Sequence, residues 1–552
     1  MRNHNYELKE DGSAQGNVVS GTADRNGRSL SALKARLAPK AARPWIPNPS
    51  PFTVHTGWRY WPRRFPLATA QTPLPTKRCW SSSAKSSNSS SSSSSSTPAP
   101  TSRSSDPSPS QASSPNSSQS SSTPPIDWDD SPDLNISAFS ELPHSGFGVN
   151  QHMLINHEFK EALRQILWQF RAPIRYAFAY GSGVFPQGSG SATGKAIHPS
   201  PASAITAAQR GQAKMIDMIF GVSYTQHWHS LNLHQHRPHY SLLGSLGSGL
   251  VSNVQDRWGA GVYFNPYVTV NGTLIKYGVV NLDTLCRDLS EWDTLYLAGR
   301  LQKPVKILRD DPRVRLANQV NLISALRVAL LLLPRTFDER QLYATIAGIS
   351  YLGDPRMSLP TENPQKVHNI VANQLPNFRR LYAPLIDNLP NITFSDPRCS
   401  NPKWAEDSTT NATLAQDMDP IKRGNMVRRL PKVFREKFYF QFQRKFQIPQ
   451  LEFNKMMEEC SDEDPTRVKR RQGGSFERRV AGDEEGLKRE VPAAIRQIIA
   501  WPSTSQSLKG VVTAGFGRTR RYIGEKVRKW REGRAKAVGA TDSGHETKRK
   551  DT

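Results

Sequence analysis

The sequence has few cysteines and lacks a long apolar run. Its four cysteines, Cys79, Cys286, Cys399 and Cys460, are far apart and form no CxxC pair. Neither a disulfide framework nor a cysteine zinc site is therefore indicated, and a reducing compartment fits. The longest apolar run, residues 328–333, stops at Pro334, far short of the roughly 18 residues that a membrane-spanning helix needs. We expect any membrane contact to be peripheral.

Acidic residues are absent from residues 25–105, where thirteen Lys and Arg occur. This composition is typical of a mitochondrial transit peptide, and the segment SLSALKARLAPKAA at 29–42 can form a short helix with leucines on one side. A disordered basic arm that binds nucleic acid is the alternative. Residues 1–24 are mildly acidic and do not fit a presequence. We expect the true start to lie downstream of Met1, or the signal to be internal.

The net charge of +26 is concentrated at the two ends. Residues 25–105 contribute +13, residues 505–552 contribute +8 and residues 1–24 contribute −2, which leaves +7 for the residues between. Such a distribution does not favour a folded nucleic-acid-binding groove. Residues 81–125 form a serine tract with scattered proline, too poor in apolar side chains to fold, and are expected to be a flexible linker.

Two stretches carry the candidate chemistry, YAFAYGSGVFPQ at 176–187 and KMIDMIFGV at 214–222. In the first, a β-prone run ends at Gly181, Ser182 and Gly183, where a turn with exposed N–H groups can receive a phosphate. In the second, Asp217 interrupts an apolar strand, which is costly unless the carboxylate is paired or binds a metal. Together they indicate nucleotide chemistry with magnesium, although a loop turn and a paired strand acid are common structural features.

The surrounding residues predict a mixed sheet. Apolar residues recur at helical spacing over 155–170 and predict a helix before the first strand, whereas residues 188–211, rich in Ser, Ala and Gly, resemble an inserted loop. Residues 263–280 contain two β-prone runs joined by Asn271 and Gly272, a strong hairpin signal. A hairpin is antiparallel, so we expect a mixed sheet.

Basic residues around these strands are candidates for binding the triphosphate. Lys276 lies inside the second hairpin strand and either faces an anion or extends to solvent. Arg300, Lys303 and Lys306 surround the extended run within 297–308, where they either hold phosphates or line a solvated sheet edge.

Five histidines lie within thirteen residues, HWHSLNLHQHRPH at 227–239. A zinc site is one interpretation, but the spacings match no standard ligand pattern and no cysteine is nearby. The other interpretation is a polar loop in which one or two histidines contact phosphate.

The second half predicts helices and then irregular chain. Residues 313–333 predict a long helix ended by Pro334, and Thr336 with Glu339 predicts a capping box opening a helix through Ser350. A third helix is expected over 365–374, and the three helices could form a winged-helix unit that packs on the catalytic domain. Residues 401–490 are polar and charged and are expected to be irregular, with 461–490 disordered.

Nine short segments resemble the mitochondrial phosphatidate cytidylyltransferase family, also called the mitochondrial translocator assembly and maintenance protein family. They are FGVNQ, YGSGVFPQ, DMIFGV, WHSLNL with HYS, WGAGVYFNP, LIKYGVV, LYLAGRLQKPVKI, IAGISYLGDPRM and SLKGVVTAG. They follow the family's order over about residues 146–380, plus the tail.

The resemblance implies a nucleotidyltransferase domain, a winged-helix-like domain and a membrane-binding C-terminus. It also implies that CTP and phosphatidic acid give CDP-diacylglycerol and pyrophosphate, with Mg²⁺, on the matrix face of the inner membrane for cardiolipin synthesis. By motif, Gly181, Ser182 and Gly183 would form the phosphate turn and Asp217 would bind the metal. Ile219 occupies the second position of the usual acidic pair, so another ligand is needed, and Asp283 is a candidate.

The C-terminal segment 519–537 predicts a peripheral anchor. Ile523, Val527 and Trp530 fall on one edge of a helix, and basic residues that include Arg528 and Lys529 flank them. An apolar edge with a tryptophan and a cationic flank suits an anionic lipid surface. A solvated basic tail is the alternative, because Gly524 and Gly533 weaken the helix.

The sequence therefore predicts an α/β (α+β) protein: a nucleotidyltransferase-like mixed sheet, then a helical winged-helix-like domain. The expected divisions are a targeting region at 1–80, a linker at 81–125, the nucleotidyltransferase domain at 126–310, the winged-helix-like domain at 311–395, an irregular region at 396–490 and a basic membrane-binding tail at 491–552.

We expect Asp217, Ser182 and Lys276 to be catalytic, and Gly181, Ser182, Gly183, Arg300 and Lys303 to bind the nucleotide. The expected partners are CTP, phosphatidic acid and anionic inner-membrane lipids, without nucleic acid. A non-enzymatic import-maintenance factor, or a nucleotidyltransferase with another acceptor, is the alternative.

Overall fold

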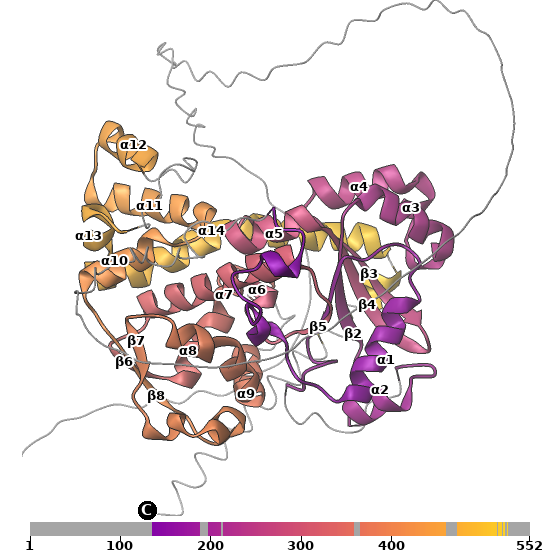
Figure 1. Cartoon of the computed structure of the whole chain (residues 1–552). Helices are drawn as coiled ribbons and strands as arrows, with labels where there is room; N and C mark the ends of the chain where they lie inside the picture. The colour runs from indigo at the N-terminus through magenta and orange to yellow at the C-terminus, as the bar shows by residue number, and fades with distance from the viewer. Residues whose placement is uncertain are drawn as a thin grey trace, which may run out of the picture. The chain divides into compact units, whose positions relative to one another are not determined.

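A five-stranded mixed sheet carries the residues singled out above (Figure 1). The computed structural model describes residues 135–187, 197–210, 213–357, 365–459 and 472–515, together with 517–521, 523, 524 and 527. The strands are β1 Tyr176–Tyr180, β2 Ile216–Val222, β3 Val262–Val270, β4 Thr273–Asn281 and β5 Lys306–Arg309, in the order β3-β4-β2-β1-β5. Only the β2–β4 pair is parallel, so the expected mixed sheet is confirmed.

The hairpin between β3 and β4 forms where the sequence predicted it. Asn271 and Gly272 have φ angles of 46° and 68°, the left-handed conformation that a type I′ turn requires at both central positions. The turn fixes the antiparallel register that pairs Val270 with Thr273.

Fourteen helices are assigned in the described residues. They are α1 His157–Trp168, α2 Ser203–Ala208, α3 Thr225–Gln235, α4 Ser248–Arg257, α5 Leu282–Glu291, α6 Ala298–Leu301, α7 Pro312–Leu332, α8 Glu339–Ile349, α9 Lys366–Asp387, α10 Pro420–Arg428, α11 Lys432–Phe446, α12 Gln450–Glu459, α13 Ser475–Gly482 and α14 Glu484–Ala514. Short 3-10 helices include η3 Arg237–His239 and η4 Leu242–Leu246. Helix α1 confirms the helix predicted before β1, and α2 lies inside the stretch expected to be a loop.

The two faces of the sheet differ in chemistry, because successive side chains of a strand point to opposite faces. Asp217 shares one face with its directly paired neighbours, Tyr180 on β1 and Lys276 on β4. On the other face, the rings of Phe220 and Tyr277 stack with their centroids 5.3 Å apart. Helices α3 and α4 contact β4, and Trp228 of α3 packs against Phe220, so these helices cover the aromatic face.

Helix α7 is buried over almost its whole length. Eighteen of its residues are buried, and it contacts α5, α6, α8, α9, α10 and α14. A helix that is apolar on all sides belongs inside a core. One hydrophobic cluster accordingly extends from Met153 to Ile499, through both of the expected central domains; their division at residue 310 remains a prediction.

A second, three-stranded sheet follows α7. It contains β6 Thr336–Asp338, β7 Ile392–Phe394 and β8 Thr413–Gln416, in the antiparallel order β6-β8-β7. The capping box lies two residues after the predicted one. Asp338 and Gln341 cap α8, whereas Thr336 lies in β6. Helix α9 extends to Asp387 rather than ending at residue 374, with a non-helical kink at Gln374.

The interpretation of residues 401–490 as irregular is wrong. This stretch contains β8 and helices α10 to α13, with Phe434, Phe438 and Phe442 fully buried on α11. The pattern is hard to recognise in the sequence because charged residues occupy many of the other positions of these helices. Residues 460–471 lie outside the described residues, as do the predicted targeting region and linker.

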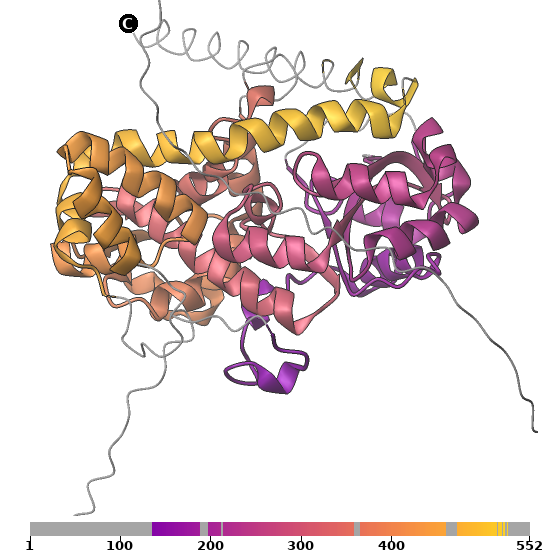
Figure 2. The same cartoon turned by 90° about the horizontal axis from the view of Figure 1, so that it is seen from above.

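Helix α14 links the C-terminal helices to the five-stranded sheet. It contacts α11, α7 and β3, and Figure 2 shows it as the long yellow helix above the other elements. The Gln506 amide accepts from the backbone N–H of Ala260 at 3.1 Å and donates to the carbonyl of Val262 at 3.0 Å. Of the helices described, none has both the length and the apolar character to cross a membrane.

A buried ion pair joins α8 to α9 beside the second sheet. Arg379 and Glu339 are both fully buried, with Nε to Oε2 at 2.8 Å and Nη2 to Oε1 at 2.5 Å. Arg379 also donates to the carbonyls of Trp404, Asp407 and Thr410, and Glu339 accepts from the N–H of Ala412 at 2.8 Å. The pair therefore anchors the loop that leads into β8.

Replacing Arg379 by alanine should lower the free energy of unfolding by about 3–5 kcal/mol, because Glu339 would be left as an unpaired buried charge. Denaturant unfolding followed by circular dichroism measures the change. The control is Arg398→Ala, which removes a 65% exposed partner of Asp396 and should change the midpoint far less. Equal destabilisation by the two variants would contradict the assigned role.

Candidate active site

The site is centred on Asp217 in β2. Its Oδ1 lies 3.6 Å from Nζ of Lys276 on the neighbouring strand, and the two side chains are 27% and 17% exposed. Lys276 therefore faces a carboxylate, the first of its two predicted alternatives. The ion pair satisfies a charge within an apolar strand, while the partial exposure leaves the pair open to a ligand.

The glycine turn abuts this carboxylate. Gly181 has φ +79°, and its carbonyl accepts from the N–H groups of Val184 and Phe185 at 3.1 and 2.9 Å. A Cβ on Gly181 would lie 3.3 Å from Oδ2 of Asp217, and a Cβ on Gly183 would lie 2.6 Å from the carbonyl of Met215. The backbone thus approaches the start of β2 so closely that only glycine fits at 183.

Arg300 on α6 belongs to the same cluster. Its Nε donates to the Tyr180 hydroxyl at 3.3 Å, and its guanidinium lies 4.0 Å from the centre of the Tyr296 ring and 6.0 Å from that of Phe264. Nζ of Lys276 lies 4.6 Å from the centre of the same Phe264 ring. Two cations and one carboxylate therefore gather beside the glycine turn.

Tyr180 stays a neutral hydrogen-bonding group in this cluster. Burial raises the pKa of its hydroxyl; Arg300 opposes this effect, and Asp217 adds to it. The phenol is therefore protonated at neutral pH, and it can accept a hydrogen bond from Arg300 and donate one to a ligand.

The other two lysines have different surroundings. Lys303 donates to the carbonyl of Gly299 and, at 2.9 Å, to the hydroxyl of Ser350, and burial lowers its pKa to about 7. Lys306 donates to the carbonyl of Met153 at 2.6 Å, and burial lowers its pKa to about 8. Both amines are held by protein oxygens, so a nucleotide role for Lys303 remains a prediction.

The histidine-rich stretch is not a loop, and its two buried histidines lie away from Asp217. Most of it forms α3 and η3, over the aromatic face of the sheet. His229 bonds the Tyr240 hydroxyl and Gln255, both at 2.8 Å, and His239 bonds the Tyr277 hydroxyl at 3.0 Å. Burial lowers the pKa of His229 to about 4 and that of His239 to about 3. Both are neutral core residues rather than phosphate ligands.

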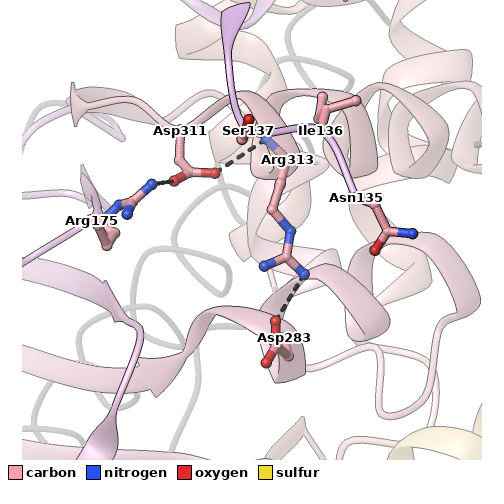
Figure 3. Close-up of a pocket in the computed structure, with 7 residues that line it drawn as sticks. All are labelled: Asn135, Ile136, Ser137, Arg175, Asp283, Asp311 and Arg313. Carbon is pink, nitrogen blue, oxygen red and sulfur yellow. Dashed lines mark hydrogen bonds and ion pairs between the residues drawn. The ribbon is translucent and has the colours of Figure 1, made fainter. Parts of the chain in front are cut away.

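The hypothesis that Asp283 completes a metal site with Asp217 is wrong. Asp283 pairs with Arg313 at 2.8 Å, and its side chain is 72% exposed. Strand β4 ends at Asn281, five residues and so about 17 Å beyond Lys276. Asp283 comes after that end, in α5. Asp283 lines a separate cavity of about 480 Å³. Figure 3 shows the ion pairs there, between Arg175 and Asp311 and between Arg313 and Asp283.

A metal at Asp217 would have few protein ligands. No group of three or more His, Cys, Asp or Glu suited to a metal occurs in the part of the chain that the structure describes. The residues present nevertheless fit Mg²⁺, which is commonly bound by one or two carboxylates together with substrate phosphates and water. Asp217 beside a phosphate-sized turn supplies that donor set.

The predicted membrane anchor lies largely beyond the described residues. Ile523 is 51% exposed and Val527 is partly buried, whereas Arg528, Lys529 and Trp530 lie outside that part of the chain. The preceding residue Arg518 is fixed to the fold, because it donates to the carbonyls of His239 and Pro238 at 2.8 and 2.6 Å.

Sequence reasoning missed the neutral residues of the site. Tyr180 and Phe264 contact the cations, and Gln209, from the supposed loop, donates to the carbonyl of Gly183 at 3.1 Å. The position of Tyr180 immediately before Gly181 was a usable signal. No local pattern marks Gln209, since Gly183 and His198, two of its three partners, lie 26 and 11 positions away.

Comparison with known proteins gives one consistent result. The family model described as phosphatidate cytidylyltransferase, mitochondrial, matches residues 163–529. Proteins with that name are similar to this chain in Saccharomyces cerevisiae (44% identity, covering 45% of this chain and 60% of that protein) and in Xenopus laevis (36% identity, covering 66% and 93%). The Danio rerio protein is 33% identical over 68% of this chain and 96% of its own length.

The chain thus spans about three-fifths of the yeast relative but nearly the whole of the two vertebrate relatives. The glycine turn, Asp217, Lys276 and Arg300 all fall inside the matched region. Because the match covers more than half of the sequence, this chain belongs to the mitochondrial phosphatidate cytidylyltransferase family.

Proposed function

We propose that this protein transfers CMP from CTP to phosphatidic acid and releases CDP-diacylglycerol and pyrophosphate. The single observation that carries the proposal is the position of Asp217, between the glycine turn and Lys276, in a member of this family. A turn with backbone donors, a carboxylate and nearby cations match the needs of a bound nucleoside triphosphate.

The reaction needs charge neutralisation and alignment more than a covalent group. An oxygen of the phosphatidate phosphate attacks the α-phosphorus of CTP, and the bond from that phosphorus to the oxygen bridging to the β-phosphate breaks. Pyrophosphate leaves with that electron pair, so no nucleophilic Ser or Cys is required. Ser182 is then a hydrogen-bond donor to the triphosphate, and Lys276 and Arg300 offset the charge that develops.

A divalent cation, proposed to be Mg²⁺, would be held by Asp217 and the substrate phosphates and would neutralise charge on the triphosphate. Lys276 already lies against this carboxylate. Its ammonium can therefore balance Asp217 before the nucleotide arrives and contact phosphate oxygens afterwards.

The proposed domain types agree with this chemistry. A mixed sheet that carries a glycine turn and an acidic strand is consistent with a nucleotidyltransferase-like domain. Helices α7, α8 and α9 with the small sheet β6-β8-β7 are consistent with a winged-helix-like unit, although β8 comes from beyond the expected boundary at residue 395. Its proposed role is packing, because Tyr382 of α9 donates to the carbonyl of Gln302 at 2.9 Å beside α6.

The proposed location is the matrix side of the mitochondrial inner membrane, where the product would serve cardiolipin synthesis. The relatives carry the word mitochondrial in their names, and the acid-free basic stretch at 25–105 is typical of an import signal.

Two acid-free stretches support peripheral membrane contact. Residues 218–255 and 491–524 contain no Asp or Glu, and they meet where the Ser241 hydroxyl donates to the carbonyl of Val512 at 3.1 Å. Ten of the eighteen exposed large apolar residues in the described part of the chain lie in these stretches. Leu242 and Leu246 on η4 are 84% and 67% exposed.

The η4–α14 surface, Leu242, Leu246, Leu508, Val511 and Val512, is accordingly proposed to meet the lipid surface. Arg257, at the end of α4, and Arg520 and Arg521, a few residues beyond α14, are exposed. Apolar side chains flanked by cations match the anionic headgroups of a bilayer. The tail residues Ile523, Val527 and Trp530 would extend this surface.

Asp217→Asn should lower cytidylyl transfer about 100-fold or more, because the lost charge would hold the cation and align the triphosphate. The assay uses purified residues 126–552 with labelled CTP, Mg²⁺ and detergent-dispersed phosphatidic acid. Asp283→Asn, an acid outside the cluster, is the control and should retain activity. Full activity of Asp217→Asn, or transfer to another acceptor in preference to phosphatidic acid, would refute the assignment.

Gly183→Val should raise the KM for CTP more than Ser182→Ala does. A valine at 183 would collide with the Met215 carbonyl, only 2.6 Å from the first added carbon, and would displace the turn. Ser182→Ala removes one hydroxyl and leaves the backbone donors in place, for an expected loss of about 10-fold or less. The phosphate-turn assignment fails if the KM for CTP is the same in both variants and the parent.

The double variant Leu242→Ser with Leu246→Ser should weaken binding to vesicles that contain cardiolipin or phosphatidic acid. A second variant, in which Ser replaces Ile523, Val527 and Trp530, should weaken it as well. Activity on detergent-dispersed substrate should change much less. Leu451→Ser, which alters a leucine 71% exposed on α12, is the control. Unchanged vesicle binding excludes the η4–α14 surface, and loss of a dimer in light scattering would assign it to a second copy of the chain.

A further inference from the structure

The segment 197–210, between β1 and β2, is tied to the site by one glutamine. Gln209 is 8% exposed, and all of its described side-chain bonds join other parts of the site. Its Nε2 donates to the carbonyls of Gly183 at 3.1 Å and Lys214 at 2.8 Å. Its Oε1 accepts from the N–H of Lys214 at 2.8 Å and lies 3.2 Å from Nε2 of His198. The amide thereby uses both of its donors and both lone pairs.

His198 extends these bonds to the hairpin. Its Nδ1 accepts from the N–H of Leu274 at 3.0 Å, so the ring is neutral and its proton lies on Nε2, facing Gln209. Next to it, the N–H of Ser200 donates to the carbonyl of Gly272 at 3.0 Å. A Cβ on Gly272 would lie 1.8 Å from the Ser200 carbonyl oxygen, so the segment lies directly against the hairpin turn.

The three residues whose backbone these bonds hold each belong to, or closely precede, a residue of the candidate site. Gly183 belongs to the glycine turn, Lys214 precedes Asp217 by three residues, and Leu274 precedes Lys276 by two. The His198–Gln209 bracket, as we call this pair, therefore spans all three elements that would enclose the triphosphate.

The segment adds little to the hydrophobic core. Ile205 is the only buried residue of α2, whereas the polar His198 and Gln209 are 7% and 8% exposed. A segment kept only for packing would bury apolar side chains at these positions. Here, the buried contacts are hydrogen bonds with defined direction, which fix geometry more than they contribute to stability.

We propose that His198 and Gln209 are positioning residues that set the distance between the glycine turn, Asp217 and Lys276 for the triphosphate of CTP. The proposal rests on the proposed function and deepens it. It assigns to the segment between β1 and β2 a role in nucleotide alignment, exerted through the backbone and without contact with the reacting atoms. Displacements of about 1 Å at such sites can cost about 100-fold in rate.

The test compares Gln209→Ala and the isosteric Gln209→Glu with Gln235→Ala. Gln235 is the control, because its amide also bonds the backbone through both its oxygen and its nitrogen, to the Arg171 N–H at 2.9 Å and the Gln169 carbonyl at 2.7 Å, between α1 and α3 and away from the glycine turn. The readouts are the Kd for CTP by calorimetry, the KM for CTP, the KM for detergent-dispersed phosphatidic acid, and the melting temperature.

Both Gln209 variants should raise the Kd and KM for CTP about 10-fold or more and leave the KM for phosphatidic acid unchanged, with melting shifts no larger than that of Gln235→Ala. Gln209→Glu should be at least as impaired as Gln209→Ala, because a carboxylate cannot donate to Gly183 and Lys214. A packing role predicts instead that the isosteric variant behaves like the parent, and that result would overturn the proposal.

A double variant separates the bracket from the catalytic assignment. His198→Ala combined with Gln209→Ala should weaken CTP binding little more than either change alone, because the pair acts as one unit. Fully additive effects would overturn the bracket. If the parent binds CTP but does not consume phosphatidic acid, the proposed function fails, and the Kd comparison still decides the role of Gln209.

Discussion

The pairing of β2 with its two neighbours is the constraint on which the site depends. β2 lies between the parallel β4 and the antiparallel β1, and this register sets Asp217 opposite both Lys276 and Tyr180. Side chains alternate along a strand, so a slip of one residue would turn Asp217 toward Phe220 and Tyr277. The aromatic packing on that face and the charged cluster on the other specify the same register, and each face excludes the wrong alignment.

Buried polar residues fix the position of Arg300. Asn321 on α7 accepts from the Trp292 indole at 2.9 Å and from Gln302 at 3.0 Å, and donates to the carbonyl of Ala298 at 3.1 Å. These bonds fix α6, which carries Arg300, against a helix that is buried almost throughout. The position of Arg300 is therefore set by the core of the protein.

Local patterns predicted the fold well where neighbours in sequence are neighbours in space. The hairpin at Asn271 and Gly272, the strands with the glycine turn, and α1 and α7 follow from periodicity and turn chemistry. Helices α10 to α13 were missed because their buried apolar residues are interspersed with charged residues. The capping box was misplaced by two residues because Thr336 and Asp338 are both good caps, and only the sheet partner β8 decides between them.

The site was predictable only in its charged members. Asp217 and Lys276 stand out in apolar strands, but their pairing depends on the parallel crossover from β2 to β4, which no local signal specifies. The histidine-rich stretch was a misleading signal, because its two buried members, His229 and His239, pack over the other face of the sheet. Asp283 follows the same strand as Lys276, yet the length of the strand separates it from Asp217.

Helix α14 covers part of a sheet edge that is synthesised long before it. β3 is an edge strand, and the Gln506 side chain bonds Ala260 and Val262 at its start. Because synthesis starts at the N-terminus, this edge is made more than 240 residues before Gln506. Until then, the Ala260 N–H and the Val262 carbonyl are open to pairing with another chain, so docking of α14 protects the start of this edge.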